Sequence, residues 1–337
     1  MKLTYQKSQI FTLALIIISI IYASIMTSFD MEYFRDRANY IIYARDSIDI
    51  LNRYANISVI VAIFNEPLFL LLNYVVSLFL SPESVVSFFI FVVTFSICYI
   101  VLKESRKNLG VLIIVFLLLP FCSYTFHLQL VTIRQGLATV LLLYAVHKSD
   151  NPRIWAFACL IASFIHISFL IIFAALILHI VFCGNKNSIF RILFIQFLFA
   201  LIMSVALFIV ARYLGIRQVD VYEGGNNSRT SGAFFIIWGF VLIYMLYTNK
   251  FKINNKYEIL SCIFLTIFLV SYFTNPTAGR LMGTFTPFIF IALAKKKTTL
   301  SIPILLMLLF LFLSIFGETI SKSSLLEPFS LKDYIFR

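Results

Sequence analysis

The chain has 337 residues, of which 61% are hydrophobic and 12% are charged, and its mean hydropathy is +0.97. No soluble core of this size can bury so much apolar surface, so the composition predicts an all-α polytopic integral membrane protein. The formal net charge is +12. The basic residues fall mainly in short connections between apolar runs, where they act as topology signals, and we therefore expect no nucleic-acid partner.

The first apolar run, 11–26, follows Lys2 and Lys7, so the positive-inside bias predicts a cytoplasmic N-terminus. The run lacks a small-residue cleavage pattern, which favours a retained first span over a cleaved signal. Further spans are expected at 84–102, 110–126, 130–147, 189–211, 233–248, 257–273, 281–294 and 300–317. With two broken segments they predict about 11 transmembrane helices, a periplasmic C-terminus and one transmembrane domain over 1–337.

The two broken segments do not fit a simple crossing of the membrane. The segment 59–80 is interrupted by Asn65, Glu66 and Pro67, so a broken or re-entrant span is expected there. The segment 154–183 is too long for one span and has His166 near its middle. Basic residues flank it on both sides, which predicts two short helices that meet near the outer face.

This topology gathers the polar residues on the extracytoplasmic side. The segment 30–56 carries charges of both signs and several tyrosines, and it is expected to form an amphipathic helix on the outer surface. Within it, Asp36 and Asp46 are candidate bases, and Tyr40 offers a stacking face for a sugar ring. The outer loop 212–232 adds Arg217 and Tyr222 as candidate acceptor contacts. For any single residue here, a solvated helix with internal ion pairs is the alternative.

Three further residues stand at helix entrances on the same side. Arg134 and Gln135 begin an otherwise apolar helix, and a guanidinium offers a planar fork of donors that suits phosphate oxygens. Arg280 begins a second such helix, so the two arginines are candidates to hold one diphosphate. An arginine that anchors its helix at the membrane interface is the alternative in both cases.

Two residues within apolar runs could carry proton chemistry. His166 could accept a proton or donate to a phosphate, because the pKa of histidine lies near neutrality, although a lone histidine often serves only in helix packing. Glu66 is a second candidate carboxylate, and a cap on the following helix is its alternative role. The sequence has no phosphate-binding loop, dinucleotide turn or zinc-ligand pair. We therefore expect no metal or cofactor.

Two motifs in chain order resemble one family. Arg134-Gln-Gly-Leu-Ala138, followed by Ala162-Ser-Phe-Ile-His166-Ile-Ser168, is similar to the core of the EpsG family, the Wzy-like polysaccharide polymerases. Asp36-Arg-Ala-Asn-Tyr40, Glu66-Pro-Leu-Phe and the late Arg280 also resemble that family. The resemblance extends from about residue 30 to about residue 290.

The resemblance implies an architecture like that of GT-C glycosyltransferases and a metal-independent polymerase of lipid-linked oligosaccharide repeat units, such as an O-antigen or exopolysaccharide polymerase. Such an enzyme transfers a growing glycan from undecaprenyl diphosphate to the non-reducing end of a new lipid-linked unit. It would lie in the bacterial cytoplasmic membrane with its site facing the periplasm. It implies that Arg134 and Arg280 hold the diphosphate and that His166, Asp36 or Glu66 serves as base. A flippase and a chain-length regulator are expected partners.

Three other functions remain open from the sequence. A flippase for the same lipid-linked sugars would require ionisable residues along the middle of several helices or two similar halves, neither of which is visible. A membrane O-acyltransferase would require a catalytic histidine near the cytoplasmic side. A noncatalytic scaffold is the third.

Overall fold

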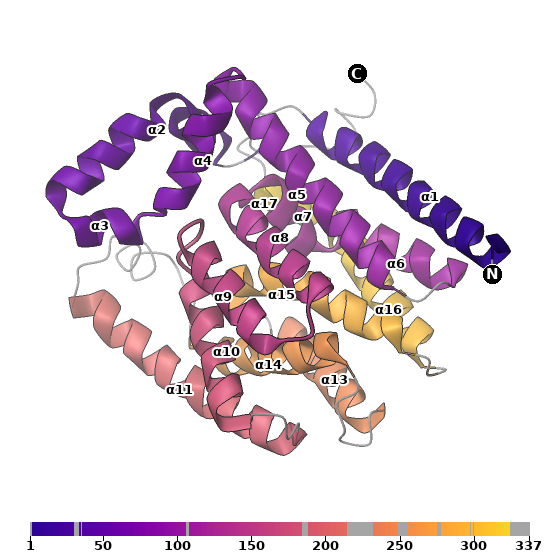
Figure 1. The fold of residues 1–337 in the computed structure, drawn as a ribbon. Helices are drawn as coiled ribbons and strands as arrows, with labels where there is room; N and C mark the ends of the chain where they lie inside the picture. The colour runs from indigo at the N-terminus through magenta and orange to yellow at the C-terminus, as the bar shows by residue number, and fades with distance from the viewer. Residues whose placement is uncertain are drawn as a thin grey trace. The chain divides into compact units, whose positions relative to one another are not determined.

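The computed structural model describes residues 2–29, 34, 36–105, 108–183, 188–213, 232–248, 255–274, 278–296, 298 and 300–323. Within these ranges every extended regular element is an α-helix, as the composition predicts. Figure 1 labels them α1 (Lys2–Thr27), α2 (Arg37–Ile57), α3 (Val59–Phe64), α4 (Pro67–Ser77), α5 (Pro82–Glu104), α6 (Leu109–Phe121), α7 (Ser123–Leu130), α8 (Ile133–Lys148), α9 (Pro152–Ser163), α10 (Phe169–Cys183), α11 (Ile189–Tyr213), α13 (Ala233–Thr248), α14 (Lys256–Ser271), α15 (Ala278–Lys295), α16 (Ser301–Ser314) and α17 (Phe316–Ser323).

The helices cluster into two compact units. The first unit comprises residues 1–173 and 294–337, and the second comprises residues 174–293. In the first unit α5 lies against α1, α2 and α8, while α2 also lies against α4, and α9 against α8 (Figure 1). In the second unit α14 lies against α11 and α13. Both units are built from the same kind of apolar helix. That the whole chain forms a single transmembrane domain stays a prediction.

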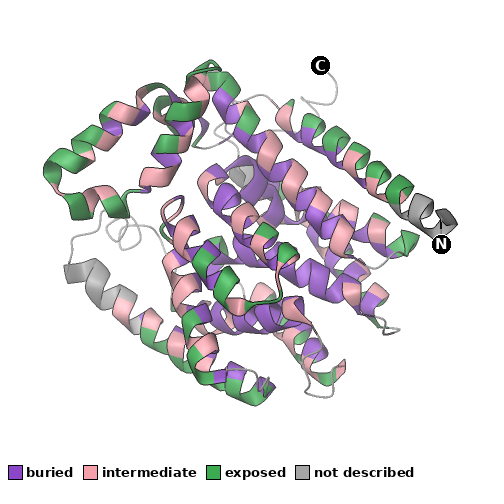
Figure 2. Ribbon diagram, in the orientation of Figure 1, coloured by how far each residue is buried: buried purple, intermediate pink, exposed green. Residues whose placement is uncertain are grey.

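Several helices have the length and composition of membrane spans. Among the described residues, Gln9–Thr27 and Pro82–Glu104 are each long and apolar enough to cross a bilayer, and shorter apolar helices accompany them. The outward face of α1 exposes Ile10, Leu13 and Ile21 (Figure 2). A helix that is apolar on its exposed face as well as its buried face fits a polytopic membrane protein. The number of spans and the orientation of the termini stay predictions.

The predicted span 110–126 is bent rather than straight. Its two parts, α6 and α7, meet at an angle of 61°. Pro120 lies in the last turn of α6, and Cys122 then adopts an extended backbone that ends the helix. The Thr125 hydroxyl donates to the carbonyl of Leu119 at 2.7 Å, so a polar backbone group at the bend remains paired. Pattern alone did not show this bend because the apolar run continues through it.

Both predicted breaks in the long apolar segments are confirmed. In the first, α3 ends at Phe64 and α4 begins with Pro67, which disfavours a right-handed helical conformation at the residue before it. In the second, α9 ends at Ser163 and α10 begins at Phe169. The position of the break between α9 and α10 near the outer face of the membrane stays a prediction.

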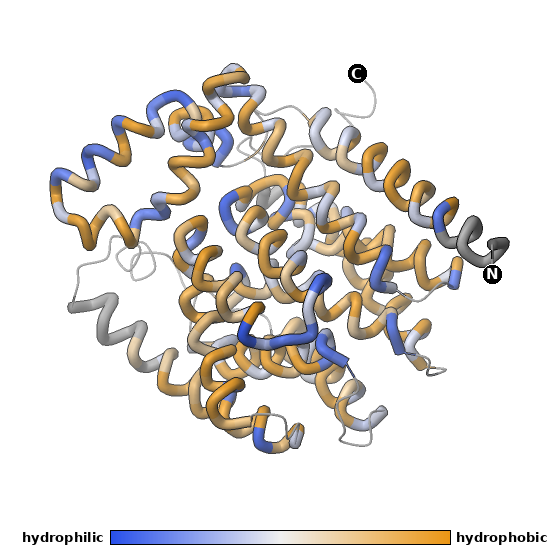
Figure 3. Tube along the Cα trace, viewed as in Figure 1, coloured by the Kyte–Doolittle hydropathy of each residue, from blue (hydrophilic) through white to orange (hydrophobic). Residues whose placement is uncertain are grey.

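The amphipathic helix predicted from the segment 30–56 is present as α2. Polar and apolar residues alternate along it, whereas most other helices are uniformly apolar (Figure 3). Its buried residues recur every three or four positions and define one face, and they are Arg37, Tyr40, Ala44, Ser47 and Ile50. One charged and one aromatic residue thus face the protein from this helix.

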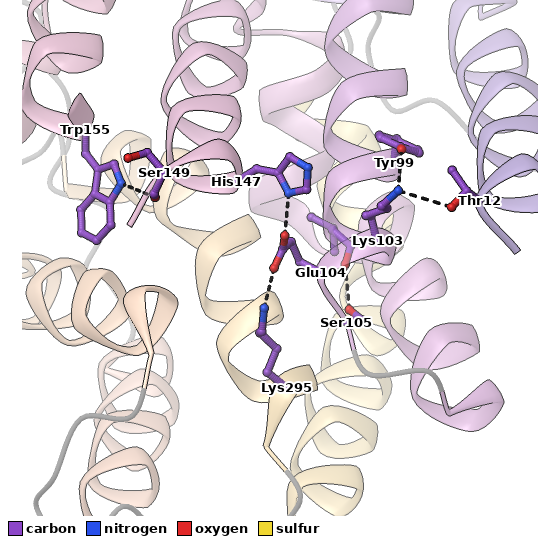
Figure 4. Close-up of polar contacts among 10 residues, drawn as sticks. Thr12, Tyr99, Lys103, Glu104, Ser105, His147, Ser149, Trp155 and Lys295 are labelled. Carbon is purple, nitrogen blue, oxygen red and sulfur yellow. Dashed lines mark hydrogen bonds and ion pairs between the residues drawn. The ribbon is translucent and has the colours of Figure 1, made fainter. Parts of the chain in front are cut away.

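A carboxylate at the end of α5 joins three helix ends. Glu104 lies 2.5 Å from Nδ1 of His147, in the last turn of α8, and pairs with Nζ of Lys295, at the end of α15 (Figure 4). Nearby, Lys103 approaches Tyr99 on its own helix and Thr12 on α1. Lys103, His147 and Lys295 lie at or near the ends of apolar runs that are far apart in the sequence, and the structure brings these ends together.

Replacing Glu104 with Ala should destabilise the protein, because it leaves the side chains of His147 and Lys295 without this shared carboxylate. We expect a loss of about 1–3 kcal/mol in unfolding free energy, reduced from the value for a fully buried pair because Lys295 is partly exposed. Thermal unfolding in detergent measures it. Glu83→Ala, at the exposed start of the same helix, is the matched control, and an equal loss in both variants contradicts the assignment.

A close approach between helices sets the position of the start of α8. A Cβ atom on Gly136 would lie 2.8 Å from the carbonyl oxygen of Leu128 in α7 and 2.8 Å from a methyl group of Val93 in α5. Both distances are shorter than any normal carbon contact, so only glycine lets these helices pack as they do. Gly136 follows Arg134 by two residues, and this packing therefore also fixes the position of that arginine.

Gly136→Ala should shift α8 away from α7 and lower stability by about 1–3 kcal/mol, as expected for overpacking. Because Arg134 moves with the helix, activity should fall with stability. Gly279→Ala is the control, since a Cβ there meets nothing within 4 Å. Unfolding curves of the two variants in detergent decide the point, and equal stability of both would mean that the approach at Gly136 relaxes freely.

Candidate functional site

The two broken segments meet at their breaks. The amide of Leu68, in the first turn of α4, donates to the carbonyl of Phe164 at 3.0 Å, and the amide of Phe69 lies 3.4 Å from the same oxygen. The start of a helix has amides with no partner in the helix, and the carbonyl at the end of α9 accepts from two of them. These bonds place Glu66 beside the backbone of residues 166 and 167.

Glu66 holds two side chains that come from distant parts of the sequence. Its Oε1 accepts from Nδ1 of His166 at 2.6 Å and from the amide of Ile167 at 3.3 Å, and its Oε2 pairs with Nη1 of Arg134. We call Glu66, Arg134 and His166 the Glu66 cluster. The Glu66 side chain is 9% exposed, whereas Arg134 and His166 are 31% and 21% exposed. The cluster thus has a buried carboxylate and two partly accessible partners.

Aromatic rings surround the guanidinium of Arg134. Its Cζ atom lies 5.8 Å from the ring centre of Tyr40, 5.2 Å from that of Tyr43 and 5.9 Å from that of Phe69. Each distance is within the range of a cation–π interaction, and the rings also exclude water from one side of the charge. The Nε atom of Arg134 is buried and has no hydrogen-bond partner in the part of the chain that the structure describes.

The predicted carboxylates share an unusual backbone conformation. Among the described residues other than glycine, Asp36 and Glu66 are the ones with positive φ, at 65° and 59°. A left-handed conformation costs a non-glycine residue roughly 1 kcal/mol or more, and such strain is common at functional positions. The bonds from the amides of Leu68 and Phe69 to the Phe164 carbonyl, and from the amide of Ile167 to the Glu66 carboxylate, hold the strained backbone of Glu66 in place. Asp36 begins α2 and is exposed.

Other predicted site residues lie apart from the cluster or outside the described residues. Gln135 follows Arg134 on α8 but is buried, at 2% exposure. Arg280 is exposed near the start of α15, in the second unit, so its pairing with Arg134 stays a prediction. Arg217 and Tyr222 lie outside the described residues.

Sequence analysis assigned no individual role to three residues that the structure places near Arg134 or Tyr40. Tyr43 and Phe69 contact the Arg134 guanidinium, and Arg37 lies one helical turn from Tyr40 on the same buried face of α2. The spacing of Arg37, Tyr40 and Ala44 by three and four residues is the signal that could have revealed this face. It was hidden because most of the neighbouring residues are polar or charged.

The arrangement leaves one nitrogen of His166 available for chemistry. An ionised carboxylate can only accept, so Nδ1 of His166 carries the proton in its bond to Glu66, and Nε2 of the neutral ring is then an acceptor. Arg134 supplies fixed positive charge beside it. A proton acceptor and a guanidinium held by one carboxylate suit a reaction in which a hydroxyl loses a proton and an anion departs.

The fold and the site together define an all-α protein with membrane-type apolar helices in which a buried carboxylate positions an arginine and a histidine. The EpsG family model matches residues 13–331, nearly the whole chain, and the protein belongs to the EpsG family. Proteins of this family are Wzy-like polymerases, which confirms the resemblance found in the sequence. Neither the curated proteins nor the solved structures contain a match to the chain.

The pairing between Glu66 and Arg134 should appear as an energetic coupling. Glu66→Gln and Arg134→Gln should each lower stability, and the double variant should lose at least about 1 kcal/mol less than the sum, because the second change removes a partner already lost. Unfolding free energies in detergent measure the cycle. Asp46→Asn, in an exposed pair with Arg45, should change stability by less than about 0.5 kcal/mol. Strictly additive losses would show that Glu66 and Arg134 do not interact.

Proposed function

We propose that this protein is a metal-independent glycosyltransferase that polymerises oligosaccharide repeat units carried on polyprenyl diphosphate. It transfers the growing glycan from its lipid diphosphate to the non-reducing end of a new lipid-linked unit. Membership of the EpsG family and the apolar helices support a membrane glycan polymerase. The observation that carries the proposal is the Glu66 cluster, which combines a proton acceptor and a cation in one place.

In the proposed step, an acceptor hydroxyl attacks the anomeric carbon of the donor glycan. The new bond forms between the hydroxyl oxygen and that carbon, and the bond from the carbon to the diphosphate oxygen breaks, with its electron pair leaving on the diphosphate. The hydroxyl proton passes to Nε2 of His166. Glu66 keeps the other ring nitrogen protonated and stabilises the imidazolium that results.

Arg134 stabilises the negative charge that the departing diphosphate gains. Its guanidinium is held by Glu66 and by three rings before substrate arrives, so little reorganisation is needed when that charge develops. Glu66 thus acts through its partners and orients them both. Among Asp36, Glu66 and His166, we assign His166 as the base. Asp36 is exposed, and we place it near the acceptor.

The donor carries its own leaving group, so no nucleotide is needed. We place the reaction at the outer leaflet of the bacterial cytoplasmic membrane, where the sequence gathers its polar segments. Arg280, Arg217 and Tyr222 remain candidates for further contacts with the diphosphate or the acceptor.

His166→Ala should reduce polymerisation by roughly a hundredfold or more, the usual effect of removing a general base. Purified protein with lipid-linked repeat units, followed by separation of products by length, measures it. His147→Gln is the control, because His147 makes the same kind of contact with a glutamate outside the site and should leave the length pattern unchanged.

Wild-type chain lengths in folded His166→Ala would contradict the assigned base. Wild-type protein that moves the lipid-linked units across a bilayer without joining them would instead indicate a flippase. Retention of each variant in the membrane fraction separates loss of activity from loss of the protein.

A further inference from the structure

Arg37 is a buried cation whose donors are mostly unused. It is 2% exposed, and its Nε donates to the carbonyl of Leu130 at 3.0 Å. Its Cζ lies 5.2 Å from the ring centre of Phe34. Both η nitrogens, which together carry four N–H donors, are buried and have no hydrogen-bond partner in the described part of the chain.

A purely structural role explains only part of this arrangement. The bond to Leu130 fixes the start of α2 against the end of α7, but an apolar side chain or a neutral donor could do this without a buried charge. Burial lowers the pKa of Arg37 to about 10, so the group is still protonated at neutral pH. A buried charge without a partner is strongly unfavourable, which points to an anion that completes the site.

Arg37 and Arg134 both interact with Tyr40. Tyr40 is three residues after Arg37 on the same buried face of α2, and it interacts electrostatically with both arginines. The guanidinium of Arg134 lies against the Tyr40 ring. The two arginines are also linked through the main chain. Leu130, whose carbonyl accepts from Arg37, is the last residue of α7 and precedes Arg134 by four positions.

The unused atoms of both arginines have the same chemical character. They are Nη1 and Nη2 of Arg37 and Nε of Arg134, all of which are cationic donors and none of which is an acceptor. A ligand that pairs with them must be an anion with several oxygens, and guanidinium forks suit phosphate oxygens especially well. Two guanidinium groups match a ligand with two phosphates. Arg134 is the more accessible of the two, with 31% of its side chain exposed.

We propose that Arg37 and Arg134 form a two-arginine diphosphate site beside Tyr40, with Arg37 as the second cation for the leaving group. This inference rests on the proposed function for the identity of the ligand, but the anion site itself can be tested without polymerisation. It assigns to a residue of α2, in the same unit as the Glu66 cluster, the role that sequence analysis gave to Arg280.

The first test is the binding of inorganic pyrophosphate to the full-length protein in detergent, by calorimetry. Arg37→Gln should weaken binding by roughly tenfold to a hundredfold, as expected for the loss of charge-assisted hydrogen bonds. Arg45→Gln is the matched control, because Arg45 is an exposed arginine on the same helix and should leave affinity unchanged. Equal affinity in wild type and folded Arg37→Gln, or no pyrophosphate binding to wild type, would overturn the site.

If Arg37→Gln does not accumulate in the membrane, Arg37→Lys decides the question. Lysine keeps the charge but loses the planar fork, and it should weaken pyrophosphate binding several-fold. An affinity within twofold of wild type in folded Arg37→Lys would overturn the proposal in that case.

The source of the anion is distinguished by competition. Polyprenyl diphosphate in the micelles should displace pyrophosphate, whereas phosphatidylglycerol at the same mole fraction should not. Displacement by both lipids to the same extent would identify a general site for lipid headgroups and overturn the assignment to a diphosphate.

Failure of this inference differs from failure of the proposed function. If Arg37→Gln binds pyrophosphate as wild type does while His166→Ala abolishes polymer, the Arg37 site is wrong and the polymerase stands. If wild-type protein makes no polymer but binds pyrophosphate through Arg37, the polymerase is wrong and the anion site stands.

Discussion

The bonds that Glu66 accepts are the constraint on which the candidate site depends. They join a break in one apolar segment to a break in another about one hundred residues later, and they also connect both breaks to Arg134 at the start of α8. The carbonyl of Phe164 accepts from the first turn of α4, which sets the Glu66 backbone, and the strained φ of Glu66 then directs its carboxylate toward His166 and Arg134. Removal of the Glu66 carboxylate would leave the Arg134 guanidinium among aromatic rings without its anion. Glu66 therefore both neutralises Arg134 and holds it in position.

Breaks in apolar helices carry a physical requirement in lipid. A chain that leaves the helical conformation frees backbone amides and carbonyls, and these are tolerated in a membrane only where protein or water pairs with them. Here the two breaks satisfy each other, since Leu68 donates to Phe164 and Ile167 donates to Glu66. The same requirement that allows the breaks therefore also concentrates polar side chains beside them. This makes the meeting of two broken segments a natural place for chemistry in a chain that is otherwise apolar.

The sequence predicted the local features of the site and failed on those that need distance information. The helical class and both breaks followed from composition, from Pro67 and from the length of the segment around His166. The bond between Glu66 and His166 did not, because no pattern in a single sequence relates residues so far apart. The bend between α6 and α7 was missed since hydropathy continues through it. Arg37 was missed for a different reason, because its polar neighbours indicated a solvated helix while its burial depends on packing against α7.

The two arginines are held in different ways, and in the proposed diphosphate site this difference gives them different parts in binding. Arg134 has an internal anion, Glu66, and is partly exposed, so a ligand must share or displace an existing pair to reach it. Arg37 is not paired with an anion in the described part of the chain, so an anionic ligand would interact with its charge without displacing another group. A diphosphate that spans both would draw Arg134 partly away from Glu66 and leave that carboxylate to His166. The imidazolium formed by proton transfer would then find its counter-charge strengthened at the moment when the leaving group needs the arginine.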